Sequence, residues 1–312
     1  MKREDDMTNC LPPYRPLRGA EPPHFVDRPS GHDPFAAGIV AQSTGAFAAG
    51  PCDPRFHAVV TGAPALGKTA VLRAIAKEAS LRLGWAASVH RCRPKERVPG
   101  RVADEVGAAV RQAWPEHLRQ FADEVVLPSG RGLPGPAAPW GSAFGEEVPW
   151  AALRRFLQLA GTFAQAISRG LVLAFDDADR LARGELEALG HLARGLSREG
   201  SPVAFVFAGG PELEAVLARA GGHCPCTWPV TLPWFCDEEA REALVVPATE
   251  RGVEFEEGAL EALCEAAGGS PLEVQRLGFV AWTAARGGDV VTLEAAEGAV
   301  AASLAQASAR AS

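Results

Sequence analysis

The chain has no apolar run near the roughly 18 residues that are needed to cross a bilayer, so we expect no membrane-spanning helix. Its beginning, MKREDDMTNC, contains no apolar stretch of the kind found in secretory leaders. The seven cysteines are odd in number and scattered over 312 residues, which favours reduced thiols over a disulfide framework. We therefore expect a cytoplasmic protein without a membrane partner.

Lysine is scarce, and the overall charge is acidic. Only four lysines occur, so arginine supplies nearly all of the positive charge, and the formal net charge is −7. This balance does not favour a broad nucleic-acid-binding surface. The 33 glycines and 25 prolines stay below the share typical of low-complexity chains, and apolar residues make up 47%. The composition therefore predicts a folded chain, and the length predicts about two domains.

Short apolar runs alternate with helix-like segments over most of the chain. The runs predict strands at 55–61, 85–89, 171–175, 203–208 and 230–232. Apolar residues at helical spacing predict helices at 69–80, 101–121, 150–168 and 184–198. This alternation indicates an α/β fold with a parallel sheet flanked by helices. Later in the chain the pattern is helical only, at 237–250, 257–267, 271–286 and 292–309.

These patterns divide the chain into three segments. Residues 1–54 carry seven prolines between positions 12 and 34, which predict an irregular arm with a short helix near 36–42. Residues 55–234 predict the α/β domain, in which 127–149 form a long loop insertion. Residues 235–312 predict a small all-helical domain.

The strongest motif follows the first predicted strand. Residues 62–69 read GAPALGKT and match the phosphate-loop pattern G-x-x-x-x-G-K-[ST] between a strand and a helix. Glycines allow a tight turn whose N–H groups face anionic oxygens, and the following helix points its positive end at the same place. Lys68 would reach the β- and γ-phosphates, and the Thr69 hydroxyl would bind Mg²⁺. The predicted nucleotide-binding residues are Gly62, Ala63, Pro64, Ala65, Leu66, Gly67, Lys68, Thr69 and Ala70. The alternative is a glycine-rich surface turn.

A buried strand that ends in acids supplies the second half of the predicted site. It reads LVLAFDD at 171–177. Asp176 would hold Mg²⁺, and Asp177 would position the attacking water, so Lys68 and Asp177 are the predicted catalytic residues. The alternative is that these acids cap the next helix, and for Asp179 we expect such capping. Because aspartate is one methylene shorter than glutamate, Asp177 predicts slow hydrolysis.

With these two motifs, which correspond to Walker A and Walker B, the chain resembles AAA+/STAND-type P-loop ATPases. It is particularly similar to the origin-recognition-like ATP-binding proteins of high-GC bacteria. Further segments that carry the resemblance are VAFVFAGGPEL at 203–213, GGSPLEVQRLG at 268–278, and PPHFVDR at 22–28, which is similar to a P-P-x-F-x-G-R box that contacts adenine. The resemblance implies a P-loop NTPase sheet followed by a small all-helical lid domain, with ATP and Mg²⁺ as ligands and ATP hydrolysis to ADP and phosphate as the reaction.

Several positions depart from that family. Asp27 stands where the adenine box has glycine, and Leu272 stands where many relatives carry a sensor arginine. Arg276, one helical turn later, is a candidate replacement. Ala208 and Gly209 occupy the place of the first sensor, and neither has a polar side chain. These departures predict a protein that binds ATP much better than it cleaves it.

Two weaker clusters have open interpretations. His223, Cys224 and Cys226 could bind zinc, but reduced buried thiols are favoured because no second ligand pair stands at a matching spacing. Arg219 is the nearest arginine to the place where an arginine finger is often found. The basic residues Arg91, Arg93, Lys95, Arg97 and Arg101 form either a solvated loop or a contact for an anionic partner or a neighbouring subunit.

Three functions remain open. The first is an Mg-ATP-dependent conformational switch with slow ATP hydrolysis. The second is a DNA-associated ATPase, similar to an initiator or a transposition helper, which ranks lower because the residues after 288 are Ala-rich and contain one arginine, Arg310. The third is an interaction scaffold with a nucleotide site that does not hydrolyse. Each includes a protein partner or a homo-oligomer whose identity the sequence does not give.

Overall fold

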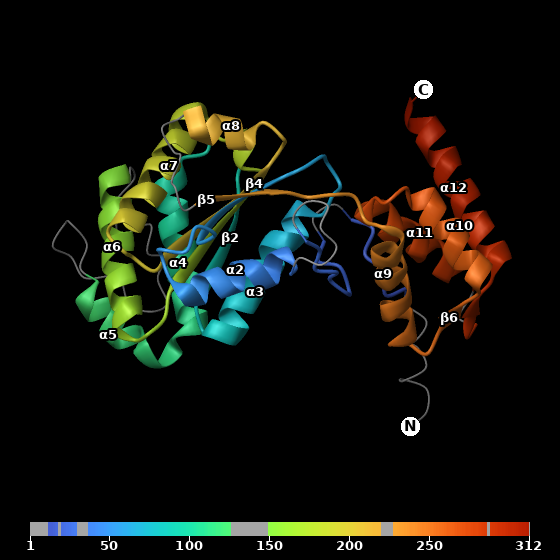
Figure 1. Cartoon of the computed structure of the whole chain (residues 1–312), viewed down its shortest axis with the longest axis horizontal. Helices are drawn as coiled ribbons and strands as arrows, with labels where there is room; N and C mark the ends of the chain where they lie inside the picture. The colour runs from blue at the N-terminus through green and yellow to red at the C-terminus, as the bar shows by residue number, and fades with distance from the viewer. Residues whose placement is uncertain are drawn as a thin grey trace. The chain divides into compact units, whose positions relative to one another are not determined.

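The computed structural model describes residues 12–17, 20–29, 37–125, 149–219, 227–285 and 288–311 (Figure 1). The described residues form two compact units. The sheet unit takes in residues of Pro29–Ala63 and Val71–Leu232. The helical unit takes in residues of Met1–Arg28, Pro64–Ala70 and Pro233–Ser312. The predicted boundaries at residues 54 and 234 stay predictions, while this grouping joins the phosphate loop and the N-terminal segment to the C-terminal helices.

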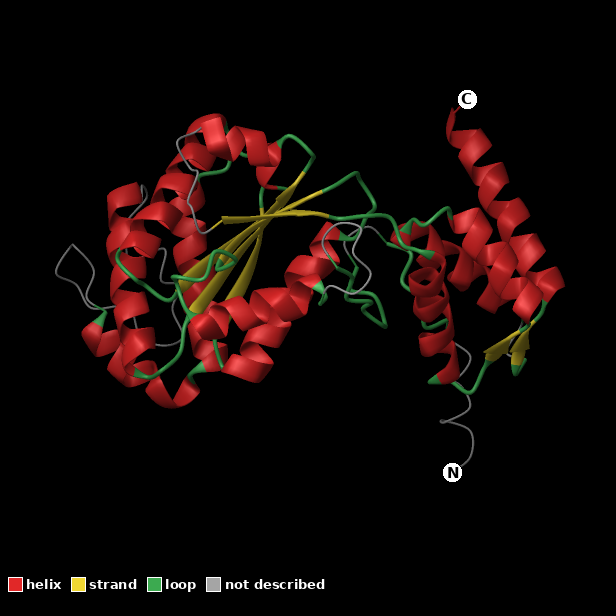
Figure 2. Cartoon of the chain, in the orientation of Figure 1, coloured by secondary structure: helices red, strands yellow, loops and turns green. Residues whose placement is uncertain are grey.

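The sheet unit is built on five parallel strands, as the sequence predicts (Figure 2). The strand order is β2-β3-β4-β1-β5. The bounds are β1 His57–Thr61, β2 Ala86–Arg91, β3 Leu171–Asp176, β4 Val203–Gly209 and β5 Thr227–Thr231. Residues of the three central strands β3, β4 and β1 are all buried, which explains why their sequences read as continuous apolar runs.

Helices cover both faces of this sheet (Figure 2). They are α2 Ile39–Ala49, α3 Lys68–Leu83, α4 Val98–Ala113, α5 Leu118–Glu124, α6 Trp150–Ala166, α7 Arg183–Arg198 and α8 Leu213–Leu217, with short 3₁₀ turns at η1 Pro115–His117 and η3 Ala178–Arg180. Helices α4, α6 and α7 share one hydrophobic core with β3 and β4. In the middle of that core Phe175, Phe205 and Phe207 stack with ring centroids 5.4 to 6.2 Å apart.

Two predicted helices in this unit differ from the structure in their bounds. The short helix expected near 36–42 is present as α2, which begins at Ile39 and runs further, to Ala49. The expected single helix at 101–121 is broken after Ala113, because Pro115 has no N–H to donate to the preceding turn. The predicted insertion at 127–149 lies outside the described residues except for Pro149.

The helical unit contains α9 Asp237–Thr249, α10 Glu257–Ala267, α11 Pro271–Ala284 and α12 Leu293–Ala311. Two-residue parallel strands, β6 Glu254–Phe255 and β7 Val290–Val291, add a ladder that the sequence analysis did not predict. These helices share a hydrophobic core into which the N-terminal segment also packs. The Tyr14 hydroxyl donates to the carbonyl of Leu244 at 2.7 Å, and the Tyr14 ring meets the Trp282 ring edge-on. No helix in the described part of the chain is long and apolar enough to span a membrane.

Candidate nucleotide-binding site

The predicted phosphate loop lies between the end of β1 at Thr61 and the start of α3 at Lys68. Its backbone takes positive φ angles at Gly62 (155°), Ala65 (72°) and Gly67 (84°). Such angles turn successive N–H groups toward one side and form a concavity that suits anions. Ala65 is not glycine, so its left-handed conformation costs about 1 kcal/mol, a strain often found at functional sites.

Gly67 has a φ of 84°, a backbone conformation that other residues rarely adopt. It lies beside Arg28, because a Cβ built on Gly67 would be in ordinary contact with Nη2, at 3.4 Å. Arg28 itself is buried, with 3% of its surface exposed. Its guanidinium donates to the carbonyl of Leu66 inside the loop and to the carbonyl of Pro233 at 2.7 Å. Burial lowers the pKa of Arg28 to about 10, so the side chain stays charged at neutral pH.

A hollow in the helical unit opens beside this loop. The N-terminal box, the phosphate loop, the segment before α9, and helices α9 and α11 all contribute to its wall. The lining residues are Pro22, His24, Phe25, Val26, Arg28, Gly67, Ala70, Phe235, Ala243, Pro271 and Gln275. The structure thus brings together the box predicted to contact adenine and two residues of the phosphate loop. Apolar and aromatic walls of this kind accept a flat base.

The predicted acids lie at the carboxyl end of β3. Asp176 is the last residue of β3 and is 5% exposed. Since β1, β4 and β3 are parallel neighbours in this order, Gly62 leaves β1 at the same edge of the sheet at which Asp176 ends β3. Asp177 follows in a left-handed conformation (φ 55°), and its Oδ2 lies 3.7 Å from Nε of Arg91 at the end of β2. This edge therefore carries two carboxylates and one arginine.

Asp179 does not cap the following helix, so that prediction is wrong. The residue before α7 is Ala182, and no side chain caps its N-terminus. Instead Asp179 Oδ2 accepts a hydrogen bond from the N–H of Gly210 at 3.1 Å, just beyond the end of β4. A carboxylate thus stands at the strand end where the sequence has no polar sensor. Sequence reasoning missed this contact because it joins residues from two different strand-end loops.

The candidate second sensor is held by its own helices. Leu272 lies in the first turn of α11, which Ser270 caps by accepting the N–H of Glu273 at 3.4 Å. Arg276 Nη1 lies 2.8 Å from Glu273 Oε1, and Nη2 donates to Gln306 at 3.3 Å. These contacts engage the charge of Arg276 within the helical unit, and its role as a replacement sensor stays a prediction.

The zinc alternative falls on residues 223–226, which lie outside the described residues. Among the residues that are described, no group of three or more His, Cys, Asp or Glu side chains could hold a metal ion. Arg219, the residue nearest the expected arginine finger, donates its Nε–H to the carbonyl of Ala215, one turn earlier, at 3.1 Å.

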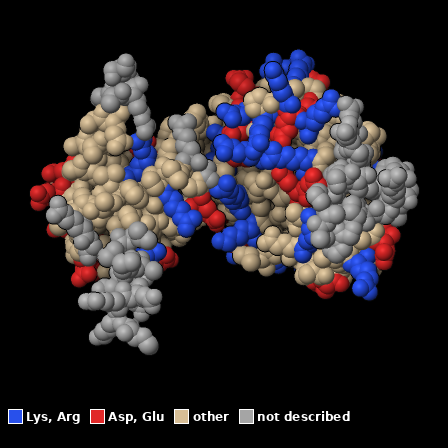
Figure 3. Space-filling view, turned by 180° about the vertical axis from the view of Figure 1, so that it is seen from behind, with Lys and Arg blue, Asp and Glu red and all other residues tan. Residues whose placement is uncertain are grey.

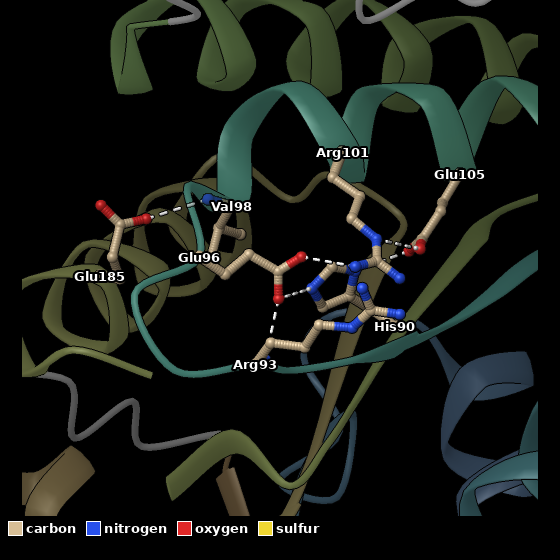
Figure 4. A network of polar contacts seen from close by, with 7 residues as sticks. All are labelled: His90, Arg93, Glu96, Val98, Arg101, Glu105 and Glu185. Atoms are coloured by element: carbon tan, nitrogen blue, oxygen red, sulfur yellow. Dashed lines mark hydrogen bonds and ion pairs between the residues drawn. The ribbon is translucent and has the colours of Figure 1, made fainter. Parts of the chain in front are cut away.

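A polar network at the end of β2 includes Arg93 and Arg101 of the basic cluster (Figure 4). Buried His90 lies between two carboxylates, with Nδ1 2.8 Å from Glu105 Oε2 and Nε2 3.3 Å from Glu96 Oε2. Arg101 donates to both, to Glu96 at 2.7 Å and to Glu105 at 3.2 Å. Both acids are therefore engaged by this network.

The outer side of the same loop is basic. The N–H of Arg93 donates to Glu96 at 2.9 Å, which holds the loop against the network. The exposed residues of this loop include Arg91, Arg93, Lys95 and Arg97. Figure 3 shows Lys and Arg side chains gathered, with acids among them, on the face of the sheet unit that it displays. The structure is compatible with both interpretations of this cluster, a solvated loop or a contact for an anion.

Comparisons with known proteins place the chain in a family. Residues 46–206 match the model of the family described as AAA ATPase domain. A comparison with curated proteins finds no match. Among solved structures, the chain is similar to Thermotoga maritima RuvB, titled a Holliday junction branch migration motor, with 17% identity and a TM-score of 0.50 over 88% of this chain and 72% of that one. It is also similar to the ADP form of Aeropyrum pernix ORC2, with 13% identity and a TM-score of 0.51 over 84% of this chain and 66% of that one.

At these identities the two structures support the fold alone. They agree with the five-stranded parallel sheet and its flanking helices. The family model begins inside α2 and covers β1, the phosphate loop, and all of β3 with the two acids at its end, so it includes both the phosphate-loop motif and the acidic motif. The similarity to proteins of high-GC bacteria finds no support in these comparisons, whereas the match to the family is direct: the chain belongs to the AAA ATPase domain family of P-loop proteins.

Proposed function

We propose that this protein binds ATP with Mg²⁺ and acts as a nucleotide-dependent conformational switch that hydrolyses ATP slowly. The observation that carries the proposal is the phosphate loop with its left-handed residues, together with the hollow that Gly67 and Ala70 line with the N-terminal box. Anionic phosphates suit the loop and the start of α3, while a base suits the apolar wall of the hollow.

The residues around the loop fit a magnesium-bound triphosphate. Lys68 supplies a compact positive charge to the β- and γ-phosphates. The hydroxyl of Thr69 and the carboxylate of Asp176 are oxygen ligands of the type that Mg²⁺ prefers. When bound, Mg²⁺ would neutralise charge on the phosphates. Asp176 is nearly fully buried at the end of β3, which limits the positions that its carboxylate can take.

Slow hydrolysis follows from what surrounds the proposed water-positioning residue. Asp177 is short, and its carboxylate lies near Arg91. Leu272 is apolar where a sensor arginine is expected, and Arg276 is engaged by Glu273 and Gln306. An arginine at the γ-phosphate, in addition to Lys68, can raise the rate by several orders of magnitude, and neither Leu272 nor the engaged Arg276 supplies one.

Calorimetric titration with Mg-ATP tests binding. We expect Lys68→Ala to weaken binding by about a hundredfold, because a charged contact to phosphate is worth roughly 3 kcal/mol. Lys77→Ala is the matched control, since Lys77 is exposed on the same helix but outside the loop, and it should bind like the wild type. Equal affinities for wild type and Lys68→Ala would end the proposal. Release of phosphate from bound ATP over hours separates slow hydrolysis from a scaffold that does not hydrolyse.

The DNA-associated alternative is favoured by one observation, the basic outer side of the loop that carries Arg91, Arg93, Lys95 and Arg97. Gel shifts with duplex DNA at increasing salt test it. A shift that weakens with salt and is lost in Lys95→Glu would support this alternative, whereas no shift at low salt would remove it.

A further inference from the structure

Arg28 is a buried cation, and burial alone does not stabilise a charged side chain. It is 3% exposed, and its Nε has no hydrogen-bond partner among the described residues. Burying an arginine is costly unless its contacts compensate. Because Nε lacks a partner, the contacts of the two terminal nitrogens and of the guanidinium plane must hold this side chain in place.

These contacts join three segments that are far apart in the sequence. The two terminal nitrogens donate to main-chain carbonyls, Nη2 to Leu66 in the phosphate loop and Nη1 to Pro233 before α9. The guanidinium also lies over the ring of Phe235, 4.8 Å from its centroid. A planar fork that bonds two carbonyls and stacks on a ring is a task for arginine, because lysine offers only a point charge.

One of these bonds fixes a peptide group of the phosphate loop. The carbonyl of Leu66 and the N–H of Gly67 belong to the same trans peptide, so they point in opposite directions. A carbonyl held by Arg28 therefore directs the Gly67 N–H away from Arg28. Gly67 has a φ of 84°, which glycine adopts readily and other residues rarely do, so glycine suits the peptide orientation that Arg28 holds.

We propose that Arg28 is a positioning residue that fixes the Leu66–Gly67 peptide so that its N–H is set for a phosphate before the nucleotide arrives. The inference rests on the proposed function, since it assumes that the loop binds phosphates. The N-terminal box then has two roles: it contacts the base, and through Arg28 it positions the phosphate loop. Arg28 contacts no phosphate itself and acts through the main chain of Leu66 and Gly67.

Hydrogen exchange of the nucleotide-free protein tests the positioning without using ATP. We expect Arg28→Lys to raise the exchange rate of peptides covering 62–70 at least tenfold and to leave those covering α9 unchanged. Arg241→Lys is the matched control, because Arg241 pairs with Glu257 in the same unit and does not line the hollow. Unchanged exchange at 62–70 in folded Arg28→Lys would overturn the inference, whether or not the protein binds ATP.

Binding of inorganic tripolyphosphate gives the second readout. It probes the loop without a base, and we expect Arg28→Lys to weaken it at least tenfold while Arg241→Lys does not. A variant that exchanges faster at 62–70 but binds tripolyphosphate like the wild type would also overturn the inference. Should Arg28→Lys fail to fold, Phe235→Leu serves instead, since it removes the stacked ring and keeps the charge. It should raise exchange at 62–70 about threefold, and no rise would count against the inference.

Discussion

The two units carry different chemistry. The helical unit contains a hollow with aromatic walls and the buried Arg28, which donates a hydrogen bond to the phosphate loop. The sheet unit offers a strand edge where Asp176 and Asp177 stand near Arg91. The first set of groups suits holding a nucleotide, whereas the second lacks a sensor side chain on Ala208 and Gly209. Binding and hydrolysis should therefore respond to different mutations.

The largest expected effect concerns the metal. Asp176→Asn removes the charge that we assign to Mg²⁺ binding, so phosphate release should fall on the order of a hundredfold. Binding of ATP in the absence of Mg²⁺ should stay within about twofold of the wild type. Asp123→Asn, an exposed acid in α5, is the control and should release phosphate normally. Normal phosphate release by Asp176→Asn would contradict the assignment.

Low pH should lower the stability of the sheet unit, because it contains a buried histidine. His57 on β1 accepts the N–H of Phe205 at 3.0 Å, and burial lowers its pKa from 6.5 to about 3. Between pH 6.5 and pH 3 the unfolded chain binds a proton that the folded chain does not, so stability falls as the pH falls through this window. At pH 5 this loss is about 2 kcal/mol for this one group.

Thermal melts from pH 7 to pH 5 measure this effect. We expect His57→Gln, which can still accept a hydrogen bond but does not titrate, to flatten the fall in melting temperature over this range. A pH dependence identical to that of the wild type would show that His57 is not responsible.

The base side of the hollow should give a smaller effect that is confined to binding. Phe25→Ala removes an aromatic wall, and we expect ATP affinity to fall about tenfold while tripolyphosphate affinity stays the same. Phe279, a partly exposed residue of α11, provides the control Phe279→Ala, which should change neither affinity. Equal loss of both ligands would show that Phe25 supports the loop rather than the base.

The smallest expected effect is a gain in ATP turnover. Asp177→Glu restores the longer side chain, and we expect ATP turnover to rise several-fold with ATP affinity unchanged, corresponding to about 1 kcal/mol in the barrier. Asp177→Asn should lower turnover instead. A rise in both variants, or in neither, would contradict a water-positioning role for this residue.

The sequence was most informative where local pattern and burial agree. β3 and β4 were predicted within one residue at each end, because strands buried on both faces read as unbroken apolar runs. Helix α10 was predicted at its observed bounds, since its apolar spacing ends at Gly268 in a left-handed cap. The phosphate loop and the acids after β3 were found because their residue types and order are fixed by chemistry.

The rest depends on contacts between distant residues. The Arg28–Leu66 bond spans 38 positions and the Asp179–Gly210 bond spans 31, and neither leaves a periodic signal in the sequence. The two-residue strands β6 and β7 are too short for any pattern to predict. The break before Pro115 does have a sequence signal, since proline removes a helical donor, but the apolar stripe continues across it and predicts a single helix.

The most direct test of the account is an experimental structure with a non-hydrolysable ATP analogue and Mg²⁺. We predict triphosphate density against the N–H groups of residues 62–69, with Lys68 beside the γ-phosphate and the metal bound by Thr69 and facing Asp176. We also predict the base in the hollow lined by Phe25. Triphosphate density away from the loop, or a metal remote from both Thr69 and Asp176, would contradict the account.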